Sequence, residues 1–143
     1  MEVLIYEVNG VLHRVVPSPD VSMAVVIKRS IPEGVEFKTM DNDTMPSHVF
    51  RNSWKVSADK VVLDIPKAKE IAHVIRREKR DEAMKANIEL IQKDAMGIPL
   101  KASESVVDAK KANADYKKDI DDVMQTTIDA AKSESGLLGA LGL

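Results

Sequence analysis

Two long stretches with helical periodicity fill most of the second half of the chain, and they constrain the fold more than any other feature. The first begins at Asp64-Ile65-Pro66, because an Asp cap and a Pro in the first turn suit backbone N–H groups that lack helical acceptors. It continues to about Lys93 and ends before Gly97-Ile98-Pro99, where Gly accepts a left-handed conformation and Pro cannot continue a helix. A second helix is predicted from Ala102 to Ser133. Together these stretches predict a helical hairpin or an extended helical arm.

The second predicted helix carries a seam with heptad spacing, in which mostly apolar residues recur at alternating steps of three and four. The seam positions are Val106, Ala109, Asn113, Tyr116, Ile120, Val123, Thr127 and Ala130. Asn at such a position is typical of residues that fix register or partner number at some cost in stability. The partner helix is either residues 64–93 folded back or a helix of another subunit. The candidate partner-binding residues on this seam are Val106, Asn113, Tyr116, Ile120 and Val123.

The two predicted helices differ in charge. Residues 66–93 hold eight basic and five acidic side chains, a balance of +3, whereas residues 101–134 hold six basic and eight acidic ones, a balance of −2. Opposite balances favour lateral pairing, but an exposed ion pair contributes only about 0–1 kcal/mol. Charge would therefore select the partner more than hold it. The charged run Arg76–Glu82 is predicted to be either solvated or laced by ion pairs.

The first 63 residues mix short apolar runs with turn signals, which is typical of a small β-containing module. Glu2–Val8 is predicted to pair with Val11–Val16 through Asn9-Gly10, because a two-residue hairpin needs positive φ at both turn positions and Asn and Gly tolerate it best. Val21–Arg29 is either a short buried helix or a strand. Val35–Met40 alternates apolar and polar residues, as a half-buried strand does.

The predicted fold class is therefore α+β, with three zones along the chain. Residues 1–63 form a small β-hairpin and short-helix module, residues 64–134 form the two-helix region, and residues 135–143 form an apolar Gly/Leu tail. Trp54, the only Trp, is most simply a core residue of the module, and a surface anchor for a partner is the lesser alternative.

The tail combines residues that oppose a helix with residues that avoid water. Its glycines at positions 136, 139 and 142 predict a poor helix. Its leucines are apolar enough that burying each one contributes about 1.5–3 kcal/mol. The tail either packs on its own domain or docks in a groove of a neighbouring protein, and the sequence does not decide between the two. The candidate partner-binding residues here are Leu137, Leu138, Leu141 and Leu143.

Composition and motifs argue against catalysis. The chain has no Cys, and its three histidines (His13, His48 and His73) are scattered, so neither a nucleophile constellation nor a metal site is predicted. No cofactor is predicted either, since no Gly-rich phosphate loop is present. Net charge is −2, which gives no general attraction to nucleic acid or an anionic membrane. The first residues do not have the pattern that predicts a signal peptide. No apolar run reaches roughly 18 residues, so no membrane span is predicted.

Three motifs carry a family resemblance. They are Phe50-Arg51-Asn52-Ser53-Trp54, Asp64-Ile65-Pro66-Lys67-Ala68-Lys69-Glu70-Ile71 and Arg76-Arg77-Glu78. Together with the turn Ile31-Pro32-Glu33-Gly34, the pattern over roughly residues 31 to 80 resembles small proteins encoded among the tail genes of tailed bacteriophages. The resemblance implies a location in the virion, after synthesis in the host cytoplasm, with other phage structural proteins as partners. It assigns no functional residue.

The sequence thus predicts a structural component of a phage particle, in the tail or head–tail region, present in several symmetric copies. One alternative is an assembly chaperone that holds tail or fibre subunits and does not stay in the virion. Another is a nucleic-acid-binding regulator that uses Arg76, Arg77, Lys79 and Arg80.

Overall fold

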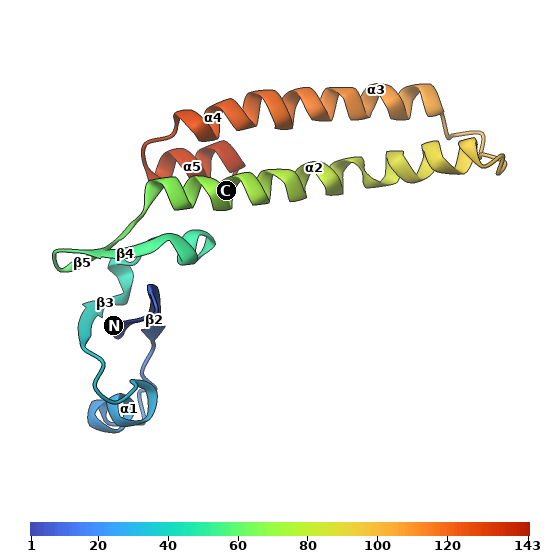
Figure 1. The fold of residues 1–143 in the computed structure, drawn as a ribbon. Helices are drawn as coiled ribbons and strands as arrows, with labels where there is room; N and C mark the ends of the chain where they lie inside the picture. Colours follow the sequence, from blue (N-terminus) through green and yellow to red (C-terminus); the bar gives the residue numbers. More distant parts are fainter. The chain divides into compact units, whose positions relative to one another are not determined.

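The computed structural model describes residues 1–143 and confirms the α+β class. Antiparallel strands and a short helix in the N-terminal part precede a long helix and a second, joined helix (Figure 1). The chain divides into two compact units, Met1–Ala68 and Lys69–Leu143. This division falls a few residues after the boundary predicted at residue 63, and the C-terminal tail belongs to the second unit.

The first unit is built on a three-stranded antiparallel sheet in the order β2-β1-β3. β1 (Glu2–Val8) and β2 (Val11–Val15) form the predicted hairpin, and Asn9 and Gly10 have the positive φ angles, 53° and 77°, that its turn requires. β3 (Phe37–Asp41) pairs with the other edge of β1. β1 is therefore the central strand, and Val3, Leu4 and Ile5 bury side chains on both faces of the sheet.

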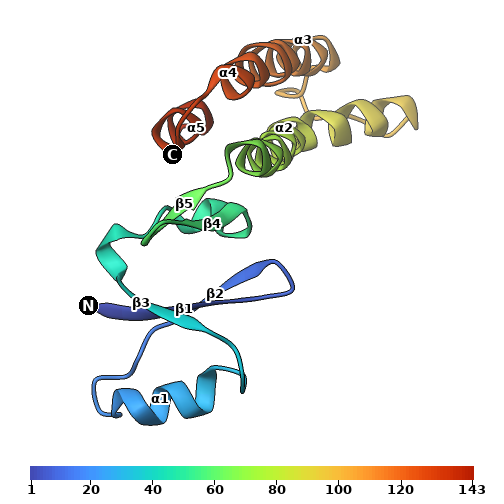
Figure 2. The same cartoon turned by 60° about the vertical axis from the view of Figure 1, so that its left-hand side comes forward.

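Helix α1 (Met23–Ser30) covers one face of this sheet, so the helical alternative for this segment holds. Figure 2 shows α1 on one side of the sheet and the β4–β5 hairpin on the other. The core beneath α1 consists of Leu4, Val26 and Ile31, with half-buried apolar neighbours around them. Because side chains alternate along a strand, Leu4 faces α1 while Val3 faces the opposite side.

A second hairpin, β4 (Trp54–Ser57) and β5 (Lys60–Leu63), lies over that opposite face of the sheet. Lys38 of β3 joins the two layers by donating from Nζ to the Ala58 carbonyl oxygen at 3.2 Å. The Trp54 side chain is buried, as expected of a core residue.

The second unit is an antiparallel helical hairpin. Helix α2 (Ile65–Ala95) begins after Asp64, whose Oδ1 accepts a hydrogen bond from the Lys67 backbone N–H at 3.4 Å. Gly97 follows the helix with a φ of 72°, as predicted for a left-handed helix end. The returning helix is continuous from residue 106 to 130, and it comprises α3 (Val106–Lys117), a π-helical segment (Lys118–Met124) and α4 (Gln125–Ala130).

The tail is helical, which corrects the prediction of a poor helix. Helix α5 (Glu134–Leu141) is closed at both ends, because the Ser133 hydroxyl oxygen accepts from the Gly136 N–H at 3.2 Å and Gly142 adopts a φ of 71°. These caps offset a helix-propensity cost of roughly 1 kcal/mol for each internal Gly. α5 folds back beside α4, where a Cβ on Gly136 would lie 3.4 Å from the Ala131 Cβ.

Candidate interaction surfaces of the helical hairpin

A polar cluster joins the two long helices near the middle of the hairpin. Asp121 of the π-helical segment accepts hydrogen bonds from Arg76 and from Arg80, whose Nη1 lies 3.2 and 3.3 Å from its two carboxylate oxygens. Arg76 is only 6% exposed. Burying an arginine is costly unless its charge is paired and hydrogen-bonded. The buried Arg76 therefore depends on Asp121 as its charge partner. Of the two alternatives for the charged run Arg76–Glu82, ion pairing holds for Arg76 and Arg80.

Further polar pairs extend this contact in both directions along the hairpin. Asn87 donates from Nδ2 to the Asn113 Oδ1 at 3.0 Å, nearer the turn. Toward the other end, His73 Nε2 lies 2.7 Å from Asp129 Oδ1. The pairs put residue 76 opposite 121 and residue 87 opposite 113. The partner helix that the seam predicts is therefore α2 of the same chain, and Asn113 fixes the register through Asn87.

The histidine in this contact has a defined hydrogen-bond role. Arg76 donates from Nε to His73 Nδ1 at 3.4 Å, so this nitrogen is an acceptor. With Nδ1 as the acceptor, Nε2 is the nitrogen that donates to Asp129. Lys69 donates from Nζ to the Asp129 carbonyl oxygen at 2.6 Å. Polar contacts therefore occupy this end of the seam as well.

Hydrogen bonds shift two pKa values in this unit, and neighbouring charges add to both shifts. Hydrogen bonds to Asp81 and then to Asp121 raise the pKa of Arg80 above its usual value. The Lys101 backbone N–H, which donates to Glu104 Oε1 at 2.8 Å, lowers the pKa of Glu104 below its usual value. The nearby Lys93, at 3.6 Å, lowers it further. Arg80 thus stays charged, and Glu104 stays ionised to a lower pH than a free carboxyl group.

The seam follows the predicted spacing as far as Asn113, and Tyr116 is already exposed. Ala109 and Asn113 are buried, but farther on Val123 is 58% exposed and the buried residues are Ile128 and Ala131. The predicted Thr127 and Ala130 are exposed. The π-helical segment explains this correction, because its i→i+5 hydrogen bonds insert one residue into the helical repeat and delay every later seam position by one.

The structure separates the predicted partner-binding residues into three groups. Asn113, Leu137 and Leu141 are buried within the chain, so for these two leucines the alternative that the tail packs on its own chain holds. Three more are half-buried; they are Val106, Ile120 and Leu138. Those that remain exposed are Tyr116, Val123 and Leu143.

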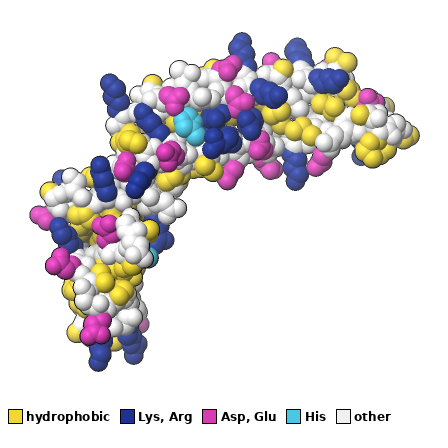
Figure 3. Space-filling view, viewed as in Figure 1, with side chains coloured by type: hydrophobic (Ala, Val, Ile, Leu, Met, Phe, Trp, Pro, Cys, Tyr) yellow, Lys and Arg dark blue, Asp and Glu magenta, His cyan; other side chains and the backbone are white.

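An apolar surface that the sequence analysis missed lies at the turn of the hairpin. We define the turn patch as Met96, Ile98 and Val107, which are 74%, 42% and 77% exposed. Met96 and Ile98 flank Gly97 between the two helices, and Val107 is in the first turn of α3. Figure 3 shows apolar side chains gathered at this end of the hairpin. The available signal was an apolar content around Gly97 and Pro99 that is unusual for a turn, where polar residues predominate.

Other classes of site receive no support from the geometry. No group of three or more His, Cys, Asp or Glu side chains converges as metal ligands do. None of the helices has both the length and the apolar character needed to span a bilayer. The chain matches no protein-family model, no curated protein and no solved structure.

Proposed function

We propose that this chain is a non-enzymatic structural protein of a bacteriophage particle, a tail or head–tail component that links neighbouring virion proteins. The observation that carries the proposal is the turn patch. Exposed apolar side chains that gather at one end of an element suit a site where another protein binds. Three large apolar side chains at the turn of a hairpin, where a partner has free access, suit docking to another protein.

The hairpin that presents this patch is held by its own polar contacts. Ion pairs and an Asn–Asn hydrogen bond run along it, and the helix ends on both sides of the turn are capped. Such an element keeps its shape before the partner arrives, so that less conformational entropy is lost on binding. This supports a docking element and gives no reason for a catalytic site.

The phage setting is supported by the resemblance over residues 31 to 80, and the fold explains what its aromatic motif does. Phe50 and Trp54 are both buried. Ser53 donates from its hydroxyl to the Phe50 carbonyl oxygen at 2.7 Å, and its own carbonyl oxygen accepts from the Asp64 N–H at 2.7 Å. The motif therefore builds the module and the start of α2. The motif supports the resemblance to the phage tail-gene proteins. Because its aromatic residues are buried, other residues must contact the partner.

The nucleic-acid-binding alternative is weakened, because two of its four basic side chains, Arg76 and Arg80, form ion pairs with Asp121.

An assembly chaperone would use the same apolar turn patch as a structural protein. The two functions differ in whether the chain stays in the finished particle. Quantitative mass spectrometry of purified particles is the test. We expect a fixed copy number relative to the other tail proteins. A chain present with tail subunits in the lysate but missing from finished particles would establish the chaperone function and contradict the proposal.

A further inference from the structure

The turn patch contains one side chain that an oxidant can convert from apolar to polar. Met96 is 74% exposed, more than any other methionine of the chain. A thioether is apolar, flexible and polarizable, which suits a surface where another protein packs. The same sulfur is open to oxidation, because an oxidant in solution reaches an exposed thioether directly.

The other methionines of the chain are mostly protected. Met40 and Met84 are buried, at 8% and 7% exposed. Three more are half-buried; they are Met23, Met45 and Met124. Met1 is 63% exposed and lies in the first unit. Met96 is therefore the one freely accessible methionine of the helical hairpin.

The backbone around Met96 is fixed by the way α2 ends. The Ile98 N–H donates to the Lys93 carbonyl oxygen at 3.1 Å. The Gly97 N–H donates to the Asp94 carbonyl oxygen at 3.0 Å, and Gly97 itself is in the left-handed conformation. Neither bond involves the Met96 side chain. An oxygen added to its sulfur therefore changes the surface while the turn keeps its shape.

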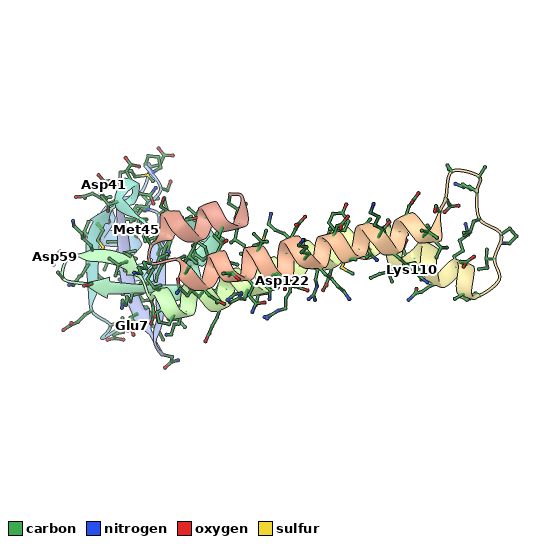
Figure 4. The ribbon with its side chains drawn as sticks, turned by 90° about the horizontal axis from the view of Figure 1, so that it is seen from above. Glu7, Asp41, Met45, Asp59, Lys110 and Asp122 are labelled. Carbon is green, nitrogen blue, oxygen red and sulfur yellow. The ribbon has the colours of Figure 1, made fainter.

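The other side of the turn is held by side chains that close the start of α3. Glu104 Oε1 accepts from the Lys101 N–H at 2.8 Å, and the Ser105 hydroxyl oxygen accepts from the Asp108 N–H at 3.3 Å. In Figure 4 the turn forms the end of the hairpin beyond Lys110, and no other element of the second unit lies beside it there or in Figure 1. A partner protein and a small oxidant thus have the same free access to the turn patch.

We propose that Met96 is a modification site, at which oxidation to methionine sulfoxide switches off docking at the turn patch. The oxidant is a peroxide. Its O–O bond breaks as one oxygen forms a bond to the Met96 sulfur, so that the thioether loses two electrons and hydrogen peroxide is reduced to water. The inference rests on the proposed function, because it concerns the same docking surface.

The chemical change opposes the contact that the turn patch makes. A sulfoxide oxygen accepts hydrogen bonds, and burying such an acceptor without a donor is unfavourable. Ile98 and Val107 stay apolar, but the patch loses one of its three large apolar side chains. Losing the burial of one Met side chain corresponds to binding that is at least about tenfold weaker.

Peptide mapping by mass spectrometry tests the modification site on the purified full chain, without any partner. The folded chain is treated with increasing hydrogen peroxide, and the sulfoxide fraction is measured at each methionine. We expect Met96 and Met1 to be oxidised first and Met40 and Met84 last, with an unchanged far-UV circular dichroism spectrum when Met96 is fully oxidised. A Met96 that reacts no faster than the buried methionines, or a chain that unfolds as Met96 reacts, would overturn the inference.

Assembly from a mixture of oxidised and unoxidised chains tests the switch. An extract from cells infected with a phage that lacks this chain is supplemented with purified, partly oxidised chain, and the finished particles are mapped in the same way. The chain in particles should contain at least about tenfold less Met96 sulfoxide than the chain supplied. Sulfoxide at the methionines of the first unit is the internal control and should be equally abundant in both samples.

Enzymatic reduction distinguishes sulfoxide formation from irreversible damage. The two methionine sulfoxide reductases, one for each sulfoxide epimer, restore the thioether. Chain that has been oxidised and then reduced should enter particles as the untreated chain does. Oxidised chain that stays excluded after Met96 is fully reduced would overturn the switch.

The outcomes separate this inference from the proposed function. Particles that take up Met96 sulfoxide in the proportion supplied would overturn the switch and leave the proposed function standing. An untreated chain that never enters particles would contradict the proposed function, and the switch with it. The order of oxidation in the purified chain decides the modification site in either case.

Discussion

Each of the two units is stabilised by a different kind of internal contact. In the first unit, Leu4, Val26 and Ile31 form an apolar core between the sheet and α1. In the second, the middle of the helix–helix seam contains a buried arginine, a shared aspartate and two asparagines. Apolar contacts are non-directional and stabilise any arrangement that excludes water, whereas polar contacts require one register.

The comparison shows how a chain with few aromatic residues obtains both a stable module and a precisely registered helical hairpin. Aromatic residues make up 3% of the chain, and both Phe and the Trp lie in the first unit. The hairpin has mostly alanines, one Met and one Ile in its seam, so register depends on Asp121 and Asn113. We therefore expect the first unit to respond mainly to loss of apolar volume and the hairpin to loss of polar partners.

The largest expected effect tests the register of the hairpin. Ile128→Asp places a charge at a fully buried position and should destabilise the second unit by more than about 4 kcal/mol. Val123→Asp, at a position predicted by uninterrupted heptad spacing but exposed in the structure, should change stability by less than about 0.5 kcal/mol. Far-UV circular dichroism during urea denaturation measures both. Equal losses would mean that the π-helical segment does not shift the seam.

The apolar core of the first unit is tested by Leu4→Ala. The side chain is fully buried, so the substitution should cost about 2–5 kcal/mol. The only Trp of the chain lies in this unit, so Trp54 fluorescence follows its unfolding directly. Val11→Ala removes a half-exposed side chain of the same sheet and is the control, expected to shift the midpoint far less.

The polar centre of the hairpin is tested by Asp121→Ala. The substitution leaves Arg76 buried without its partner, which we expect to cost about 2–3 kcal/mol, below the loss for a fully buried pair because Asp121 is partly exposed. Asp122→Ala removes the adjacent exposed carboxylate and should be close to neutral. Thermal unfolding of the two variants side by side makes the measurement. Matching melting temperatures would refute the role assigned to the pair.

The smallest effect concerns pH. The pKa of Glu104 is lowered in the folded chain by the Lys101 N–H and by Lys93. A depressed carboxyl pKa contributes stability above the unfolded pKa, and this stability is lost as pH falls through the folded pKa. Glu104→Gln should therefore melt slightly below wild type at neutral pH and converge with it in acid. A difference that persists unchanged in acid would show that the charge of Glu104 is not involved.

The elements with local signals could be predicted from the sequence. Asn9-Gly10 located the first hairpin, and Asp64 and Gly97 located the ends of α2, because caps and turns depend on neighbouring residues. The second half of the seam could not be predicted, since the π-helical segment places Asp121 against arginines distant in sequence. Helix α5 was missed because its caps and packing outweigh the propensity of its glycines.

The candidate site was only partly predictable for a similar reason. Periodicity identifies a face of a helix but not what covers it, so Leu137 and Leu141 were indistinguishable from Leu143, although only the last is exposed. The turn patch required knowledge that the two helices pair, because pairing leaves Met96, Ile98 and Val107 together at one end without cover.

Incorporation of a turn-patch variant into particles tests the central claim most directly. Met96→Ser, Ile98→Ser and Val107→Ser together remove the exposed apolar surface without touching the seam, and Val123→Ser removes an exposed apolar side chain elsewhere on the hairpin. We predict that the triple variant melts close to wild type yet is lost from purified particles, while Val123→Ser is incorporated normally. A folded triple variant that enters particles at the wild-type copy number would contradict the account.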